Sequence, residues 1–185
     1  ADGSLDTTFG TGGKANTDLK TYLGSDSVTM LSDGKLMVTG RGNESSSFVL
    51  ERYNSDGSLD TGFGTGGKLR TVVGGRGLDN NSVAVQSDGK LVVSGDFWNE
   101  VILENEFCMV RYNTNGSRDT SFGIGGKVVV PMGGIVTMQP DGKLLVASGN
   151  GEYSFVLIRY NVDGSLDVGF GSGGIVNSNL GWDFG

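Results

Sequence analysis

The 185-residue chain contains no histidine, one cysteine and two prolines. Without histidine, the chain by itself has no Ser-His-Asp or Cys-His catalytic group and no histidine-ligated zinc site. The single cysteine, Cys108, excludes an intrachain disulfide. Its neighbours Phe107 and Met109 are apolar, which predicts that Cys108 is a buried core residue. These absences favour a protein without catalytic residues.

Long apolar runs and an excess of basic charge are missing as well. No run approaches the roughly 20 apolar residues of a membrane helix, and no signal segment opens the chain. We therefore expect the mature form to be soluble, with no membrane partner. The net charge is -7, from 21 acidic and 14 basic residues. Because a negative chain repels phosphate backbones, we expect no nucleic-acid partner.

Glycine, in contrast, is abundant, with 34 residues. It favours tight turns because it adopts positive φ without a steric cost. Much of it belongs to one repeated motif, DGSLDTGFGTGGK and its variants, which recurs at intervals of roughly 50 residues, as in repeat proteins. The copies begin at Asp2, Asp56, Asn115 and Asp163.

Between consecutive motifs, three apolar runs recur in the same order. The first two flank an Asp-Gly pair, at Asp33, Asp88 and Asp141, which is the strongest short-range signal for a β-hairpin. The third run ends in Arg-Tyr-Asn and begins at Ser47, Phe107 and Ser154. We expect the fourth strand inside the motif itself, at SLDTGFG and its relatives. The repeated unit is then a four-stranded antiparallel meander.

The second strand of each unit is apolar on both faces, which requires cover on both sides of the sheet. Sheets that stack radially cover one another in this way, and the repeat length suits a β-propeller. The predicted fold class is therefore all-β, with three full blades of four-stranded antiparallel sheet plus one extra strand in the N-terminal motif. A β-sandwich is the alternative fold. We divide this single repeat domain into a partial repeat (1–26), three blades (27–81, 82–134 and 135–185) and a tail within the last.

The stretches RYNSDGSLDTGFGTGGK and SDGKLVVSG closely resemble the delta-60 repeat, a β-propeller-like unit of large bacterial extracellular and cell-surface proteins. The resemblance covers nearly the whole chain. The resemblance implies a bacterial repeat protein that is secreted or lies on the cell surface. It does not imply a defined activity. Two units depart from the pattern. VVVPMGGIVTM shortens one unit before its first strand, and GDFWNEVILENEF lengthens another between its second and third strands.

The lengthened unit supplies the main candidates for function, because the common scaffold does not require its residues. Tryptophan beside carboxylates suits carbohydrate binding, and a pair of carboxylates also suits glycoside hydrolysis. Packing of the inserted loop or of an interface is the competing interpretation. The candidate ligand-binding residues are Asp96, Phe97, Trp98, Glu100, Glu104 and Glu106, together with Trp182 in the tail.

The acidic residues of the motif alternate as calcium ligands do, at Asn54, Asp56, Ser58 and Asp60. Glycine and glutamate are missing from the positions at which an EF-hand loop requires them. We therefore expect these side chains to stabilise turns, with no cofactor bound and calcium as the alternative.

An arginine recurs once per unit, in the Arg-Tyr-Asn run. We predict a structural role for it, in which the head group caps carbonyls or pairs with the last aspartate of the motif. The predicted pairs are Arg52 with Asp60, Arg111 with Asp119, and Arg159 with Asp167.

The favoured function is a non-catalytic binding or scaffolding module whose ligand is a glycan or a protein. The alternative is an enzyme: a carboxylate-dependent glycoside hydrolase or lyase, or another hydrolase, with its site in the inserted loop or on the ring axis.

Three blades are too few for a closed ring, and an open arc would expose apolar sheet at each end. We therefore expect a homodimer in which two chains complete a ring of about six blades. A longer repeat array, of which this chain is a piece, is the alternative.

Overall fold

The computed structural model describes residues 2–16, 22–42, 47–130, 133–149 and 154–179. In these ranges the chain forms twelve strands and no helix. The strands make three four-stranded antiparallel sheets, so the predicted all-β fold with four-stranded blades is confirmed. Accordingly, the described ranges contain no helix that is long and apolar enough to cross a membrane.

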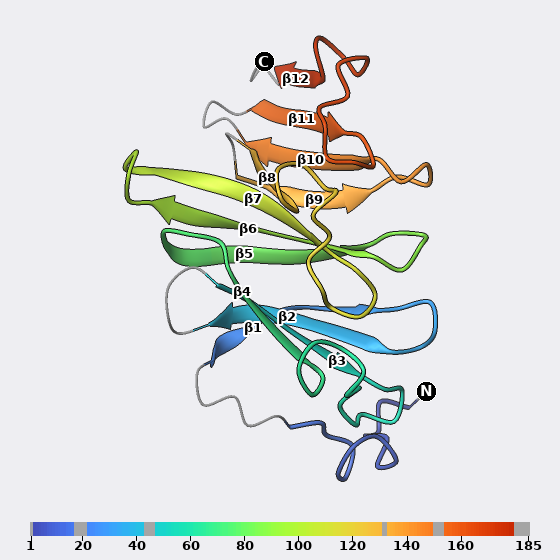
Figure 1. Cartoon of the computed structure of the whole chain (residues 1–185). Helices are drawn as coiled ribbons and strands as arrows, with labels where there is room; N and C mark the ends of the chain where they lie inside the picture. Colours follow the sequence, from blue (N-terminus) through green and yellow to red (C-terminus); the bar gives the residue numbers. More distant parts are fainter. Residues whose placement is uncertain (1, 17–21, 43–46, 131–132, 150–153, 180–185) are drawn as a thin grey trace, which may run out of the picture.

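Each sheet contains four strands that pair in the order in which they occur in the chain. The sheets stack one on another, from the first (blue) to the third (orange and red) in Figure 1. The first comprises β1 (Tyr22–Met30), β2 (Leu36–Gly42), β3 (Ser47–Tyr53) and β4 (Lys68–Val72). The second comprises β5 (Arg76–Val85), β6 (Leu91–Asn99), β7 (Glu104–Tyr112) and β8 (Lys127–Val130). The third comprises β9 (Ile135–Met138), β10 (Leu144–Gly149), β11 (Ser154–Tyr160) and β12 (Ile175–Asn179).

The first hairpin of each sheet turns at the Asp-Gly pair, as predicted. In the first sheet, Gly34 has a φ of 82°, and Asp33 Oδ1 accepts a hydrogen bond from Lys35 N at 3.1 Å. Glycine adopts this left-handed conformation without strain, and the aspartate side chain stabilises the turn. The same turn joins β5 to β6 and β9 to β10.

The fourth strand lies further along the chain than the sequence predicted. The segment SLDTGFG forms turns with an isolated bridge between Tyr53 and Leu59, and β4 pairs with β3 only from Lys68 onward. The prediction was wrong because the motif glycines, such as Gly64 with a φ of 54°, reverse the chain before the strand begins. For the same reason, residues 2–16 form turns and isolated bridges rather than a strand. Strands β1 and β5 begin a few residues ahead of the blade boundaries at 27 and 82.

The core consists of two apolar layers, one on each face of the middle sheet. One layer contains Met37 and Phe48 of the first sheet with Val93 of the second. The other contains Val92 of the second sheet with Leu144 of the third. Strand β6 is therefore buried on both faces, whereas burial alternates along β10. The predicted cover on both faces applies in full to the middle sheet.

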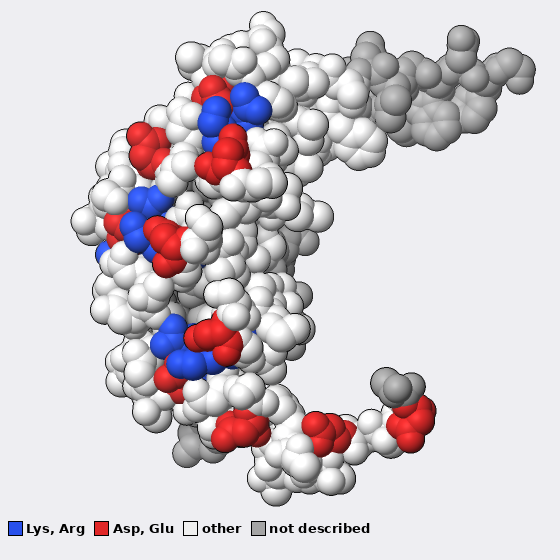
Figure 2. All heavy atoms as spheres, turned by 90° about the vertical axis from the view of Figure 1, so that its right-hand side faces the viewer, with Lys and Arg blue, Asp and Glu red and all other residues white. Residues whose placement is uncertain are grey.

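The three sheets follow one another along an open arc, which Figure 2 shows in profile. Their first strands, β1, β5 and β9, lie next to one another along the arc. At its far end the third sheet leaves an apolar face uncovered. Phe155 is 59% exposed, whereas Phe48 and Phe107, which precede the Arg-Tyr pair by the same spacing in the other repeats, are 0% exposed.

Candidate functional site

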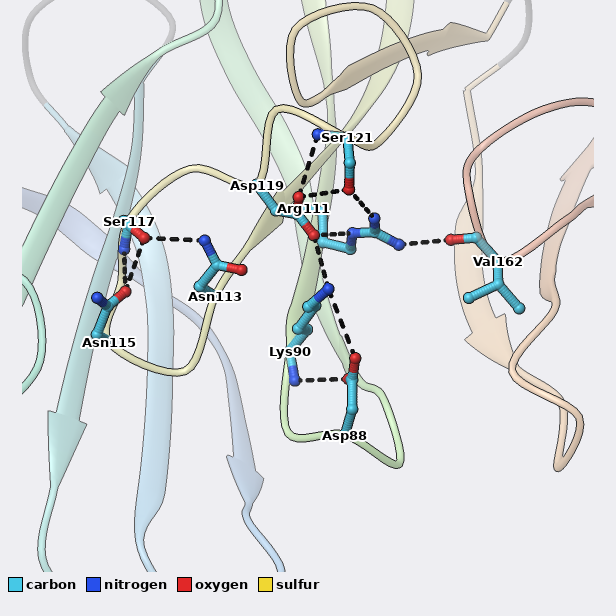
Figure 3. A network of polar contacts seen from close by, with 9 residues as sticks. All are labelled: Asp88, Lys90, Arg111, Asn113, Asn115, Ser117, Asp119, Ser121 and Val162. Carbon is cyan, nitrogen blue, oxygen red and sulfur yellow. Dashed lines mark hydrogen bonds and ion pairs between the residues drawn. The ribbon is translucent and has the colours of Figure 1, made fainter.

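The last aspartate of each full motif is held by two cations of its own repeat. In the second repeat, Asp119 Oδ2 lies 2.8 Å from Arg111 Nε and 3.0 Å from Lys90 Nζ, as Figure 3 shows. Arg111 comes from the third strand and Lys90 from the Asp-Gly turn. The predicted arginine–aspartate pairing is confirmed in all three repeats, and a lysine that the sequence did not suggest joins each pair. The other groups are Arg52 and Lys35 with Asp60, and Arg159 and Lys143 with Asp167.

These interactions keep the aspartates ionised. The hydroxyl of Ser121 is the main cause that holds the pKa of Asp119 well below its usual range, and Lys90 and Arg111 also lower this pKa. Hydrogen bonds from Lys35 and Lys143 are the main causes that lower the pKa values of Asp60 and Asp167. A carboxylate with a lowered pKa is a poor general acid or base near neutral pH. These aspartates therefore serve the scaffold.

Two of these arginines also reach into the next repeat. Arg52 Nη1 donates a hydrogen bond to the Thr114 carbonyl, and Arg111 Nη1 donates one to the Val162 carbonyl. Figure 3 shows Arg111 between Asp119 of its own repeat and Val162 of the following one. The Arg111 guanidinium also lies 4.7 Å from the centroid of the Phe122 ring. One side chain therefore connects two repeats.

A second contact, formed by glycines, accompanies the carbonyl contacts of Arg52 and Arg111. Gly64 N donates to the Asn115 carbonyl at 2.9 Å, so the Phe-Gly pair of one motif sits on the Asn-Gly turn of the next. A Cβ atom on Gly116 would lie 3.0 Å from the Phe63 ring and 2.9 Å from Gly64 N. We call this contact the repeat junction: the Phe-Gly pair of one motif against the Asp-Gly or Asn-Gly turn of the next. The other junction bonds are Gly10 N to the Asp56 carbonyl at 2.7 Å and Gly123 N to the Asp163 carbonyl at 2.8 Å.

The residues considered as calcium ligands have other partners. Asp56 Oδ1 accepts hydrogen bonds from Ser58 N at 2.9 Å and from Ser58 Oγ at 2.6 Å. Asn54 Nδ2 donates to Ser58 Oγ at 3.0 Å, and Asp60 binds the two cations of its repeat. These are turn and ion-pair roles. Among the described residues, no group of three or more Cys, Asp or Glu is placed to hold a metal ion.

Open grooves lie along two of the junctions. One, of about 680 Å³, is lined by Ser121 and Lys127 of one motif and by Asp163 and Ser165 of the next. The other, of about 430 Å³, lies between the first two motifs. The sequence did not predict these grooves, because each wall comes from a different repeat.

The inserted segment forms a long β6–β7 hairpin, paired as far as Asn99 and Glu104. Phe97 is 3% exposed, and Lys127 Nζ lies 4.6 Å from the centroid of its ring, so Phe97 belongs to the core. Trp98 is 40% exposed. Glu106 accepts a hydrogen bond from Asn99 Nδ2 at 2.8 Å.

The hairpin separates the candidate residues onto two faces. Trp98 pairs across the hairpin with Asn105, which lies between Glu104 and Glu106 in the chain. Because side chains alternate along a strand, Trp98 shares a face with Asp96, whereas Glu104 and Glu106 point to the other side. Glu100 is exposed in the turn that follows. The predicted grouping of Trp98 with Glu104 and Glu106 is therefore not formed, and Trp182 lies outside the described residues.

The apex of the hairpin carries three apolar residues that sequence analysis considered only as packing residues of the inserted loop or of an interface. Val101 is 90% exposed, Ile102 50% and Leu103 66%. Leu103 has a φ of 58°, and in the described ranges every other residue with positive φ is a glycine. The sequence signal for an exposed apolar apex was the run of three consecutive apolar residues at a position where turns usually have polar residues.

Comparison with protein families gives a match to a β-propeller domain of unknown function (DUF5122) over residues 31–63, 86–122 and 139–170. Each matched segment runs from the Asp-Gly turn of a repeat to the phenylalanine region of its motif. Comparison with curated proteins gives no match. The three segments cover more than half of the chain, and each contains the second and third strands of one of its sheets. The chain therefore belongs to the DUF5122 β-propeller family.

Proposed function

We propose that the protein is a non-catalytic scaffold of β-propeller repeats that presents the β6–β7 hairpin as a ligand-binding element. The observation that carries this proposal is Leu103, which is 66% exposed and has a φ of 58°. A left-handed conformation costs a non-glycine residue about 1–2 kcal/mol. An exposed side chain returns little of that cost through burial. Strain of this kind that does not serve the core supports a functional role for the apex.

A carbohydrate is the first ligand class that we propose. Trp98 is 40% exposed and lies on the same face as Asp96, two residues earlier. An aromatic ring can stack on the apolar face of a sugar, while a nearby carboxylate accepts hydrogen bonds from its hydroxyls.

A protein ligand is the second candidate, and the apex favours it. Val101, Ile102 and Leu103 form a contiguous apolar tip on the β6–β7 hairpin. Exposed apolar residues of this kind serve as anchors in protein interfaces.

A glycan array tests the first ligand class with the wild-type protein, Trp98→Ala and a matched control, Phe155→Ala. Phe155 is an exposed aromatic residue, at 59%, that lies outside the hairpin. We expect glycan affinity to fall at least about tenfold for Trp98→Ala, roughly 1.4 kcal/mol of binding free energy, and to stay unchanged for Phe155→Ala. Equal signals from all three proteins would show that Trp98 is not part of a glycan site. The protein-ligand candidate would then be tested by comparing how the wild type and Leu103→Ser bind a protein ligand.

The enzyme alternative has little support in the geometry of the described residues. Glu104 is exposed, Glu106 is bonded to Asn99, and neither lines the two junction grooves. The non-catalytic proposal would be overturned by an activity that hydrolyses a glycoside or an ester, copurifies with the protein and is lost in the Glu106→Gln variant.

We further propose that these repeats are of the delta-60 type and that the protein acts outside a bacterial cell, secreted or on the surface. The motif DGSLDTGFGTGGK supports this assignment through its resemblance to such repeats. Detection of the protein only in the cytosolic fraction of its source cell would contradict the proposed location.

A further inference from the structure

We propose that the groove between the motifs that begin at Asn115 and Asp163 binds an extended peptide segment of a partner protein. The segment adds to the free edge of β8 and carries an apolar side chain next to a basic one. This apolar groove, of about 680 Å³, is lined by Ile124 and Val129 of one motif and by Asp163 of the next, among others. The inference concerns a second binding surface and does not depend on the ligand of the β6–β7 hairpin.

The other repeats serve as internal controls for the residues of the apolar groove. Ile124 is 92% exposed and Val129 is 46% exposed. The other motifs have exposed polar residues at both positions, namely Thr11, Thr65 and Ser172 in place of Ile124, and Asn16, Arg70 and Asn177 in place of Val129. The common scaffold therefore requires neither apolar residue. Two such replacements in one groove indicate contact with an apolar ligand.

The groove between the first two motifs shows what the polar residues provide at the same place. Thr11 and Asn16 line it, at the positions that Ile124 and Val129 occupy in the apolar groove. The hollow itself therefore follows from the repeat junction, whereas its apolar lining is specific to one repeat.

Strand β8 offers backbone groups to a peptide. It is an edge strand of the second sheet, paired with β7 alone. Lys127 exchanges two backbone hydrogen bonds with Ile124, of 2.9 and 3.2 Å, so its N–H and C=O groups point away from β7. Backbone groups alternate in direction along a strand, so those of Val129 point the same way as those of Lys127. In the described part of the chain, no other strand or turn bonds to them. Unpaired groups at the edge of a groove suit an extended peptide that pairs as an added strand.

The charge of the apolar groove favours a basic peptide. Asp163 is exposed, and the hydroxyl of Ser165 is the main cause that holds the pKa of the Asp163 carboxyl below its usual value. Lys127 also lines the groove, but its Nζ donates to the Val73 carbonyl at 2.7 Å and lies 4.6 Å from the centroid of the Phe97 ring. The carboxylate is therefore the charge that a ligand meets, and a basic side chain complements it.

Each test variant takes its new residue from another repeat, in which the fold already accepts it. Ile124→Thr introduces the threonine of the first two motifs. Asp163→Asn introduces the asparagine of the preceding motif, where Asn115 makes the same turn with Ser117. Val168→Thr is the matched control, because Val168 is 71% exposed, does not line the apolar groove and is replaced by threonine in the other motifs. Circular dichroism melting confirms that each variant is folded.

The probe is a library of short random peptides, selected in parallel on the wild type and on Ile124→Thr. We expect the wild type to enrich peptides with a basic residue beside an apolar one. For a synthetic copy of an enriched peptide, Ile124→Thr should lose at least about fivefold in affinity, because less apolar area is buried. Asp163→Asn should lose about twofold, as expected for an exposed charge pair, and Val168→Thr should bind as the wild type does.

Nuclear magnetic resonance then tests the mode of binding. The enriched peptide should shift the amide signal of Val129, and a copy N-methylated at alternate residues should not bind, because it cannot pair as a strand. The proposal is overturned if the wild type enriches no peptide over Ile124→Thr, or if the N-methylated copy binds equally well. Self-association of the wild type that is lost in Ile124→Thr would assign the groove to a second copy of the chain and would also overturn it.

Discussion

At the scale of single residues, Arg111 shows how the motif joins repeats. Its Nε pairs with Asp119, its Nη2 donates to Ser121 Oγ at 3.0 Å, and its Nη1 donates to the carbonyl of Val162. The residue is 4% exposed, so these bonds form away from bulk water. The same side chain therefore fixes the turn of its own motif and the position of the next repeat.

Replacement of this arginine is expected to be costly. Arg111→Met keeps the length of the side chain but leaves Asp119 without its closest cation and the Val162 carbonyl without its donor. Removing one partner of a buried ion pair costs about 3–5 kcal/mol. Because Lys90 remains beside Asp119, we expect the free energy of unfolding to fall by about 3 kcal/mol, at the lower end of this range. Urea denaturation measures this loss. Arg118→Met, at an exposed position, is the control and should change stability by less than about 0.5 kcal/mol; equal losses in both variants would contradict the assigned role.

Residue roles could be predicted from the sequence where both partners lie a few residues apart in one repeat. The pairing of Arg111 with Asp119 was predictable because the two recur together at a fixed short spacing. The bond from Arg111 to Val162 spans 51 residues and depends on how neighbouring sheets stack, which no local pattern encodes. Lys90 belongs to the same repeat as Asp119, but it lies in a different hairpin, so its contact depends on how the two hairpins of one sheet pack together.

At the scale of elements, the motif is a linker that makes contacts rather than a strand. Its alternating residues resembled a strand, yet its glycines adopt positive φ and its side chains bond to one another. The fourth strands start only after the final Gly-Gly pair, so the sequence predicted the number of strands per sheet but misplaced the fourth. In the β6–β7 hairpin, the candidate ligand-binding residues could be chosen from the sequence. Which of them share a face could not, because this depends on the exact register of the two strands.

Two glycine substitutions separate the effect of the junction from that of backbone strain. Gly116→Ala places a Cβ atom against Phe63 and Gly64, at a φ of 87°. Gly125→Ala has a similar backbone problem, with a φ of 58°, but open space around the new atom. We expect a loss of about 1 kcal/mol for Gly125→Ala and about 2–4 kcal/mol for Gly116→Ala, because overpacking adds to strain.

Thermal or urea unfolding of both proteins provides the measurement. A loss for Gly116→Ala no greater than that for Gly125→Ala would mean that the Asn-Gly turn does not pack tightly on the preceding motif.

At the scale of the whole molecule, three sheets form an arc in which the described residues place an apolar layer on each face of the middle sheet. Strand β3 of the first sheet is buried on both faces as well, whereas burial alternates along β10. The charges follow the same order: in Figure 2, Lys and Arg gather beside Asp and Glu in clusters spaced along the arc. Each described full motif contributes one such ion-pair group. The scaffold is thus a linear series of equivalent junctions, and the β6–β7 hairpin is its main irregularity.

The central claim is that the motif joins each repeat to the next through a backbone hydrogen bond, which Gly171 N does not make within the described residues. Amide hydrogen exchange of the 185-residue chain tests it most directly, because Gly64, Gly123 and Gly171 occupy the same motif position. Gly64 N and Gly123 N donate to the next repeat, and Gly171 N has no acceptor in the described chain. We predict that Gly64 and Gly123 exchange at least about tenfold more slowly than Gly171, since exchange requires the junction to open. Equal exchange rates at the three positions would contradict the account.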